Sequence, residues 1–459
     1  AGMRPDASGH QREPAPHPGM SGDAFPVLQS PDVSVRGKSW RIEWTFKQIF
    51  TPRNKELRKR ILFTLGCLAI FIIGTTISIP NTNKLSGDLG FLELLNSIGG
   101  GALKRGSIFG LGVMPYISAS IIIQLFTMNI IPYFTELAKE GYSGRRKLNT
   151  ITRYFGIAIA FIQGIILSLG IVGSGSDAMS YIKVAVILTA GTAFLLWIGD
   201  QITQKGVGNG LSLIIMAGIV AQLPYMMTEA FKTFVLDNDN LFIGIVSFII
   251  YVAIYFAIVI GVVFIQESER RIPIQYSNKT SSAYGAKQTY IPFRVNAAGV
   301  MPVIFASTII AIPQTLANFI KSEGYIKFVN NYLNYNTVVG LIIYLVLIVL
   351  FSYIYTLLQF RPADISENLQ KNGGYIPGIR PGVETKNYIK SVLIKITTFG
   401  SLFLVVIAAL PILFSNYSNV QNANITLGGT GILIVVGVAL ETYKQIESVL
   451  TQKEYKRRF

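Results

Sequence analysis

The residues that could do chemistry within this chain are few, and most of them are uncharged. The only histidines are His10 and His17, and the only cysteine is Cys67. The apolar stretches therefore contain no histidine that could act in catalysis or bind a metal. With a single cysteine, an internal disulfide is impossible. We interpret Cys67 as a small apolar packing residue. The sequence predicts no catalytic site, no metal site and no cofactor.

The segment Gly206-Val-Gly-Asn-Gly210 superficially resembles a nucleotide-binding loop. Such a loop follows a strand, and no strand is expected here, so we interpret the segment as a turn that enters a helix. The chain also lacks the phosphate-binding pattern G-x-x-x-x-G-K-[ST], which argues against nucleotide hydrolysis.

Uncharged polar side chains within apolar stretches are the remaining candidates: Ser118, Ser120, Gln124, Asn209, Asn296 and Ser307. In a membrane such groups usually form hydrogen bonds between helices, worth about 1 kcal/mol each, which suits a seam that must open. Charged residues such as Asp200, Arg361 and Glu441 fall near the ends of the apolar stretches. Ion-coupled transporters and proton pumps need ionisable groups at membrane depth, so their scarcity argues against both classes.

The elements that must position these residues are long apolar stretches. Hydrophobic residues make up 51% of the chain and charged residues only 14%, whereas a soluble domain carries about 25% charged residues. A large soluble helical protein is excluded because many apolar runs reach the roughly 20 residues that cross a bilayer. We predict a polytopic membrane protein with helical spans, since lipid offers no partner for open backbone groups.

Ten spans are expected from the apolar runs. They are Ile61–Pro80, Phe109–Ile131, Ile151–Val172, Tyr181–Gln201, Leu211–Met227, Leu241–Ile265, Ala297–Ile320, Val338–Phe360, Ile389–Phe414 and Leu427–Leu450.

The basic residues predict the orientation of these spans. With a cytoplasmic N-terminus, the outside loops hold only 7 of the 40 Lys and Arg residues, as the positive-inside rule requires. These seven are Lys84, Lys104, Arg105, Lys183, Lys232, Lys321 and Lys327. An even number of spans then places both termini in the cytoplasm. The net charge of +16 is explained mostly by this topology and by attraction to anionic membrane lipids.

An internal repeat indicates how the spans are arranged. Val113-Met-Pro-Tyr-Ile-Ser-Ala-Ser-Ile-Ile-Ile123 is matched by Val300-Met-Pro-Val-Ile-Phe-Ala-Ser-Thr-Ile-Ile310. Isoleucine matches alone mean little, but the shared Met-Pro and Ala-Ser pairs indicate a duplication. Five spans separate the copies, so the second crosses in the opposite direction. The fold class predicted is all-α, with ten spans in two inverted five-helix halves around a central pathway.

The rest of the chain divides around these halves. Residues 1–39 are interpreted as a disordered or artificial extension, with a natural targeting or regulatory tail as the alternative. Residues 40–60 are basic and amphipathic and suit a helix at the cytoplasmic interface. The halves are 61–240 and 241–450, and a basic tail follows at 451–459. Residues 90–106 are too short and polar to span, and are either a short helix folded into a cavity on a glycine hinge or an external loop.

Four segments together resemble the SecY family, which forms the pore of the bacterial protein translocation channel. They are Phe109–Gln124, Gly206–Gly210, Asn296–Pro302 and Pro377–Gly382, and the resemblance runs from about Trp40 to Phe459. It implies an hourglass of ten helices with a ring of apolar side chains at its waist. By motif position this pore ring is Val113, Ile117, Leu211, Ile215, Ile304 and Ile434. Val113 and Leu211 stand where isoleucine is frequent in the family, and ordinary helix packing is the alternative for all six.

The resemblance also implies a plug and a lateral gate. The plug corresponds to about 91–105 and includes Phe91, Leu94, Leu95 and Gly100. The gate lies between spans two–three and seven–eight. Gln124 and Asn296 match its polar contact, with Ser120, Asn209 and Ser307 nearby.

Partners follow from the same resemblance. The cytoplasmic loops 266–295 and 361–388 correspond to docking sites for the motor ATPase SecA and for ribosomes, and we expect Arg270, Arg271 and Arg380 to make these contacts. A solvated run of charge is the alternative for Arg270 and Arg271. SecE and SecG subunits, signal sequences and nascent chains are the other expected partners. The predicted function is a passive protein-conducting channel of the bacterial cytoplasmic membrane, with a secondary transporter as the alternative.

Overall fold

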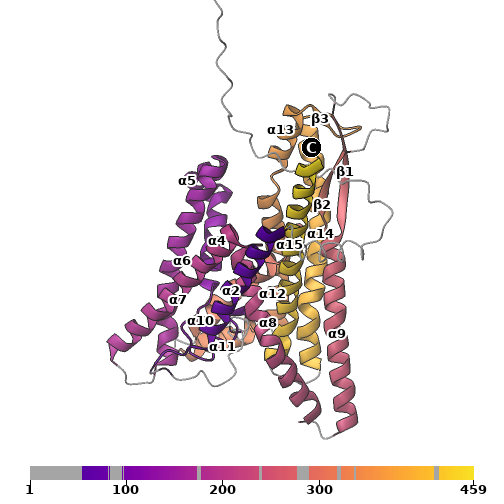
Figure 1. Ribbon diagram of the computed structural model, residues 1–459. Coiled ribbons are helices and arrows are strands. Elements are labelled where there is room, and N and C mark those ends of the chain that lie inside the picture. Colours follow the sequence, from indigo (N-terminus) through magenta and orange to yellow (C-terminus); the bar gives the residue numbers. More distant parts are fainter. Residues whose placement is uncertain are drawn as a thin grey trace, which may run out of the picture.

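The chain forms a long helical bundle that carries a small sheet at one end (Figure 1). The computed structural model describes residues 54–80, 82, 96, 98–172, 177–236, 240–276, 289–317, 322–334, 337–417 and 423–458. Residues 1–39, most of 40–60, and the expected plug residues Phe91, Leu94 and Leu95 lie outside this range.

The elements are α2 (Lys55–Thr76), α4 (Met114–Leu125), a π-helical turn (Phe126–Ile130), α5 (Pro132–Lys139), α6 (Tyr142–Ile171), α7 (Ala178–Lys205), α8 (Gly210–Phe231), a second π-helical turn (Lys232–Leu236), α9 (Leu241–Glu267), β1 (Glu269–Tyr276), β2 (Thr289–Arg294), α10 (Met301–Ala317), α11 (Glu323–Tyr332), α12 (Val338–Gln359), α13 (Pro362–Lys371), β3 (Gly374–Tyr375), α14 (Val383–Tyr417) and α15 (Ala423–Arg458).

Each of the ten expected spans coincides with one of these helices. Six described helices are long and apolar enough to cross a membrane, namely α6, α7, α8, α9, α12 (continued through α13) and α14. The repeat-bearing helices α4 and α10 are apolar but shorter. In α4 the α-helical geometry gives way to a π-helical turn and then to Pro132. The chain is therefore an all-α polytopic membrane protein, and its ten crossings remain a prediction.

Local sequence explains where several helices begin. Both α4 and α10 start at a Met-Pro pair, and proline is tolerated there because the first-turn N–H groups lack helical partners. At α8 the cap is Asn209, whose side chain accepts a hydrogen bond from the N–H of Leu211. The segment Gly206–Gly210 is thus the turn into a helix that the sequence predicts.

One apolar core joins the two halves of the chain. Helices α4 and α10 contact each other, and α15 packs against α8, α9 and α14. The core cluster includes buried side chains from both halves, for example Phe71, Ile214, Ile348 and Leu404. The C-terminal half is thus packed onto the N-terminal half through its last helix.

The two loops expected at 266–295 and 361–388 contain short strands that pair with each other. Strand β1 lies between β2 and β3, and both pairs are antiparallel. Ile272 and Ile274 alternate with the exposed Pro273 and pack on a second apolar cluster that includes Leu393 of α14. Figure 1 shows this sheet at the same end of the molecule as α13 and the C-terminus.

Helix α15 also extends further than expected. The predicted span ends at Leu450, whereas the helix continues to Arg458. The basic residues interpreted as a tail therefore lie on the last turns of a helix.

Candidate functional site

The two copies of the repeat begin with the same backbone turn. The N–H of Gly112 donates to the carbonyl of Phe109 at 2.8 Å, and the N–H of Gly299 donates to the carbonyl of Asn296 at 3.3 Å. Both glycines have positive φ, +56° and +63°, a region that side chains with a Cβ disfavour. The resemblance in sequence is thus matched by a resemblance in conformation at equivalent positions.

The six residues of the expected pore ring all belong to the central apolar cluster. Val113, Ile215, Ile304 and Ile434 are buried, with exposed fractions of 2%, 6%, 3% and 2%. Ile117 and Leu211 are partly buried and pack against the same cluster. The ring residues therefore come from α4, α8, α10 and α15 and from the residue preceding α4, and they share one apolar environment.

Leu211 has a neighbour that the ring hypothesis does not require. Its side chain lies over Gly199 of α7, close enough that a Cβ at Gly199 would sit 2.7 Å from Cδ2 of Leu211. Leu211 thus fills the contact between α7 and α8. Its packing fits the alternative interpretation, ordinary helix packing, better than that of the other five residues.

The segment Ile98–Ser107, which we call the glycine-rich segment, is largely buried in the bundle. Ile98 and Ala102 belong to the central cluster. A Cβ at Gly218 of α8 would collide with the carbonyl oxygen of Ile98, so the segment lies directly on the backbone of α8. Gly100, the expected plug residue that the structure describes, has a φ of +71°. This placement corresponds to the folded-in alternative rather than to an external loop.

The five expected gate residues have hydrogen-bond partners close by in the chain. Gln124 Nε2 donates to Ser120 Oγ at 3.0 Å, and Asn296 Nδ2 donates to the carbonyl of Gly299 at 2.9 Å. Ser307 Oγ donates to the carbonyl of Ile304 at 2.8 Å.

The fifth gate residue, Asn209, caps α8. Ser118, which is outside the gate set, behaves in the same way, because its Oγ donates to the carbonyl of Met114. The hydrogen bonds of these side chains are thus local in the described structure, and the interhelical contacts expected of them remain a prediction. Hydroxyl groups within an apolar helix find the carbonyl one turn back as their nearest acceptor.

Other residues, which the sequence analysis missed, do form polar contacts between elements. Thr192 Oγ1 of α7 donates to the carbonyl of Gly112 at 3.1 Å and so fixes the turn before α4. Thr64 Oγ1 of α2 accepts from the N–H of Val207 at 3.1 Å. Threonines in apolar helices are common, and only their position opposite an open backbone group distinguishes these two.

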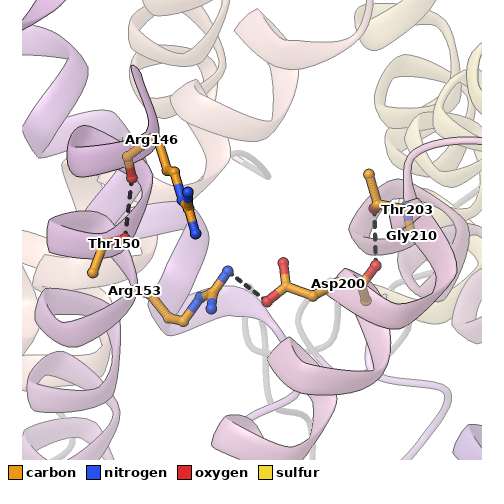
Figure 2. Close-up of polar contacts among 7 residues, drawn as sticks. Arg146, Thr150, Arg153, Asp200, Thr203 and Gly210 are labelled. Atoms are coloured by element: carbon orange, nitrogen blue, oxygen red, sulfur yellow. Dashed lines mark hydrogen bonds and ion pairs between the residues drawn. The ribbon is translucent and has the colours of Figure 1, made fainter. Parts of the chain in front are cut away.

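An ion pair joins α6 to α7. Arg153 and Asp200 point toward each other from neighbouring helices, with 2.5 Å between nitrogen and oxygen (Figure 2). One turn further along α7, Thr203 Oγ1 accepts from the N–H of Gly210 at 2.9 Å and ties α7 to the start of α8. Both side chains of the ion pair are partly exposed, and Asp200 lies within two turns of the end of α7, as expected.

The expected docking residues lie on the sheet and on a nearby turn. Arg270 pairs with Phe293 and Arg271 with Pro292. Because neighbouring strand residues point to opposite faces, the two arginines do not form one patch. Arg271 lies over the ring of Tyr290, 4.8 Å from its centroid.

Arg380 is exposed on a turn whose backbone is fixed from both sides. Its carbonyl accepts from Thr385 Oγ1 at 2.8 Å, and the carbonyl of Gly382 accepts from Ser366 Oγ at 2.7 Å. Both hydroxyl-bearing residues are buried. The turn is therefore attached to α13 through Ser366 and to α14 through Thr385.

Comparison with known proteins accounts for this arrangement. The SecY family model matches residues 107–443. A protein translocase subunit SecY of Staphylococcus epidermidis is 46% identical over 425 residues, which cover 90% of this chain and 98% of the relative. The chain belongs to the SecY family.

A second relative and a solved structure are also similar to this chain. The SecY subunit of Staphylococcus aureus is 45% identical over 417 residues, covering 88% of this chain and 97% of the relative. A structure described as that of a protein conducting channel has a TM-score of 0.59 at 17% identity, covering 85% of this chain and 92% of its own.

The structure of an idle yeast Ssh1 complex bound to the yeast 80S ribosome has a TM-score of 0.60 at 15% identity. The match covers 84% of this chain and 89% of the chain in that structure. At these identities the structures establish a shared SecY fold.

Proposed function

We propose that this SecY-family chain is the pore subunit of a channel that moves unfolded preproteins across the bacterial cytoplasmic membrane. The observation that carries the proposal is the 46% identity to a protein translocase subunit along nine tenths of the chain. The channel is passive, and SecA or a translating ribosome supplies the energy. SecE and SecG complete the complex, in which the chain crosses the membrane ten times with both termini in the cytoplasm.

The pore ring forms the constriction of this channel. Five of its six residues lie in the apolar core without the competing contact of Leu211, and Ile117 and Ile304 are equivalent in the repeat. A narrow hydrophobic neck dewets and so blocks ions when nothing is in transit. It also offers a passing polypeptide no strong partner, so unrelated sequences can pass.

The glycine-rich segment acts as the plug of the resting channel. Its contact with Gly218 and the burial of Ile98 and Ala102 place it in the core that the ring shares. Where the segment lies on Gly218 of α8 the contact is with its backbone, at the carbonyl oxygen of Ile98 and the nitrogen of Gly100, so few side chains interlock at that point.

The seam between α4 and α10 acts as the lateral gate. The two helices are in contact, while Gln124 and Asn296 use their hydrogen bonds locally. Packing therefore closes the seam. Each apolar residue of a signal sequence gains about 0.3–0.6 kcal/mol in lipid, so an apolar core of about ten gains about 3–6 kcal/mol. A hydrophilic segment gains nothing there and stays in the pore.

The sheet and the Arg380 turn form the cytoplasmic docking surface. The sheet lies at the end that carries α13 and the C-terminus (Figure 1), and the Arg380 turn is attached to α13 through Ser366. Positive charge on a fixed turn suits an acidic protein surface or ribosomal RNA, and SecA and the ribosome provide these.

Reconstitution tests the proposal against a secondary transporter. The chain is placed in vesicles with SecE and SecG, and a preprotein and SecA are added outside. We expect ATP-dependent protection of the preprotein from protease, lost when SecA is omitted. Gradient-driven uptake of a small solute with no protected preprotein would overturn the proposal in favour of the transporter.

A further inference from the structure

Helix α11 has a surface that the channel function does not use. It connects α10 to α12 and contacts both. Tyr325 Oη donates to the carbonyl of Pro313 near the end of α10 at 3.2 Å. Gln314 Nε2 of α10 donates to the carbonyl of Leu333, just after α11, at 2.8 Å. The helix is therefore held firmly beside the ends of its two neighbours.

Three different surfaces run along α11. Val329 is 2% exposed and faces the protein. Phe328 and Tyr332, one turn apart, are 53% and 49% exposed, with ring centroids 5.2 Å apart. The exposed polar residues Glu323, Lys327 and Asn330 lie on the other side of the helix from this aromatic pair, and the exposed Asn331 lies at the boundary between Phe328 and Lys327. Helical spacing thus separates an aromatic flank from a polar flank.

The aromatic flank adjoins the lipid-facing surface of α12. Val338, Ile342 and Val346 follow one another on one side of α12 and are 75%, 55% and 60% exposed. In a membrane protein such a stripe contacts acyl chains. It begins six residues after Tyr332, so the level of α11 is the border between acyl chains and water, where amphipathic helices and aromatic rings are most favourably placed.

We propose that α11 lies in the membrane interface, with the Phe328–Tyr332 flank inserted among the lipids and the Lys327 flank in water. The occupant of the aromatic flank is the phospholipid bilayer. Helix α11 then holds the adjoining ends of α10 and α12 at a constant depth, whatever the state of the seam between α4 and α10. The inference depends on membrane embedding and is independent of what the channel transports.

Tryptophan fluorescence tests this placement. The natural Trp40, Trp44 and Trp197 are replaced by Phe, and Phe328→Trp is introduced as the single reporter. The protein is reconstituted in phosphatidylcholine and phosphatidylglycerol vesicles with or without brominated acyl chains. We expect a blue-shifted emission that is lost in brominated vesicles and little affected by aqueous iodide.

Lys327→Trp is the matched control, one residue earlier on the polar flank. Its emission should be red-shifted, quenched by iodide and insensitive to bromine. Should Phe328→Trp fail to fold, Tyr332→Trp reports on the same flank. Iodide quenching of the aromatic-flank reporter would overturn the proposal. Protection from both quenchers would also overturn it, because a protein would then cover the flank.

Discussion

Gly112 and Gly299 adopt the same left-handed conformation at the same place in two copies of one turn. Each N–H donates to the carbonyl three residues earlier, and each turn leads into a Met-Pro helix start. Two segments so far apart in the chain do not share a turn, a positive φ and a helix start by composition alone. The backbone therefore supports an internal duplication independently of the matching side chains.

Gly299→Ala should destabilise the protein through its backbone. No heavy atom lies within 4 Å of the added Cβ, so the cost comes from the left-handed conformation, about 1–2 kcal/mol. Thermal unfolding in detergent should show a lower Tm. Gly66→Ala is the control, because Gly66 lies in α2 with equal space and no positive φ. Equal Tm values for the two variants would contradict the argument.

Replacing Ile117 and Ile304 together with Ser should raise the resting ion conductance several-fold. Hydroxyl groups at the constriction let water enter, and ions follow. Planar-bilayer recordings of the reconstituted channel measure the leak. The control replaces the exposed Ile187 and Ile342 with Ser, which should leave conductance unchanged. Unchanged conductance in the first variant would remove the two isoleucines from the constriction.

Gly218→Ala should loosen the glycine-rich segment. The added methyl group would collide with the carbonyl oxygen of Ile98 and approach the nitrogen of Gly100 to 3.0 Å. The segment must therefore move off α8, and resting conductance should rise in the same recordings. Gly170→Ala, which meets no atom within 4 Å, serves as the comparison. A tight channel with Gly218→Ala would show that this contact does not hold the seal.

Hydropathy and the repeat predict much of this fold. Ten apolar runs become ten helices because burial of backbone polar groups leaves few alternatives in lipid. The equivalence of Ile117 and Ile304 follows from letters in the sequence. The local hydrogen bonds of Gln124 and Asn296 do not, because an amide has partners both within its own element and across the seam, and only coordinates distinguish them.

The contacts between distant segments also cannot be predicted from this sequence alone. The pairing of Gln275 with Tyr375 joins two loops that are distant in the chain. The hydrophobic alternation in β1 was visible, but its partner strand β3 is only two residues long. Likewise, the sequence does not indicate that Gly218 contacts Ile98, because this contact depends on how closely the two backbones approach each other.

The ion pair between Arg153 and Asp200 should contribute modestly to stability. Their side chains are 46% and 28% exposed, so we expect a coupling of about 0.2–1 kcal/mol. A double-mutant cycle with Arg153→Gln, Asp200→Asn and the combined variant measures it from unfolding free energies. The coupling should fall as salt is added, since exposed charges are screened. Strictly additive effects would mean that the pair contributes nothing.

Thr385 should control docking at Arg380 without touching the partner. Arg380→Glu removes the positive charge and should abolish SecA-driven transport while the protein stays folded. Thr385→Val keeps Arg380 but removes the hydroxyl that holds its carbonyl, so the turn becomes less well fixed and SecA binding should weaken. Thr385→Ser restores the hydroxyl and should restore binding, which a purely steric role of the threonine would not produce. Binding is measured by titrating SecA onto reconstituted channels, with Thr398→Val, on an exposed turn of α14, as the comparison. If Thr385→Val binds SecA as tightly as the unaltered chain, the hydroxyl has no role in positioning Arg380.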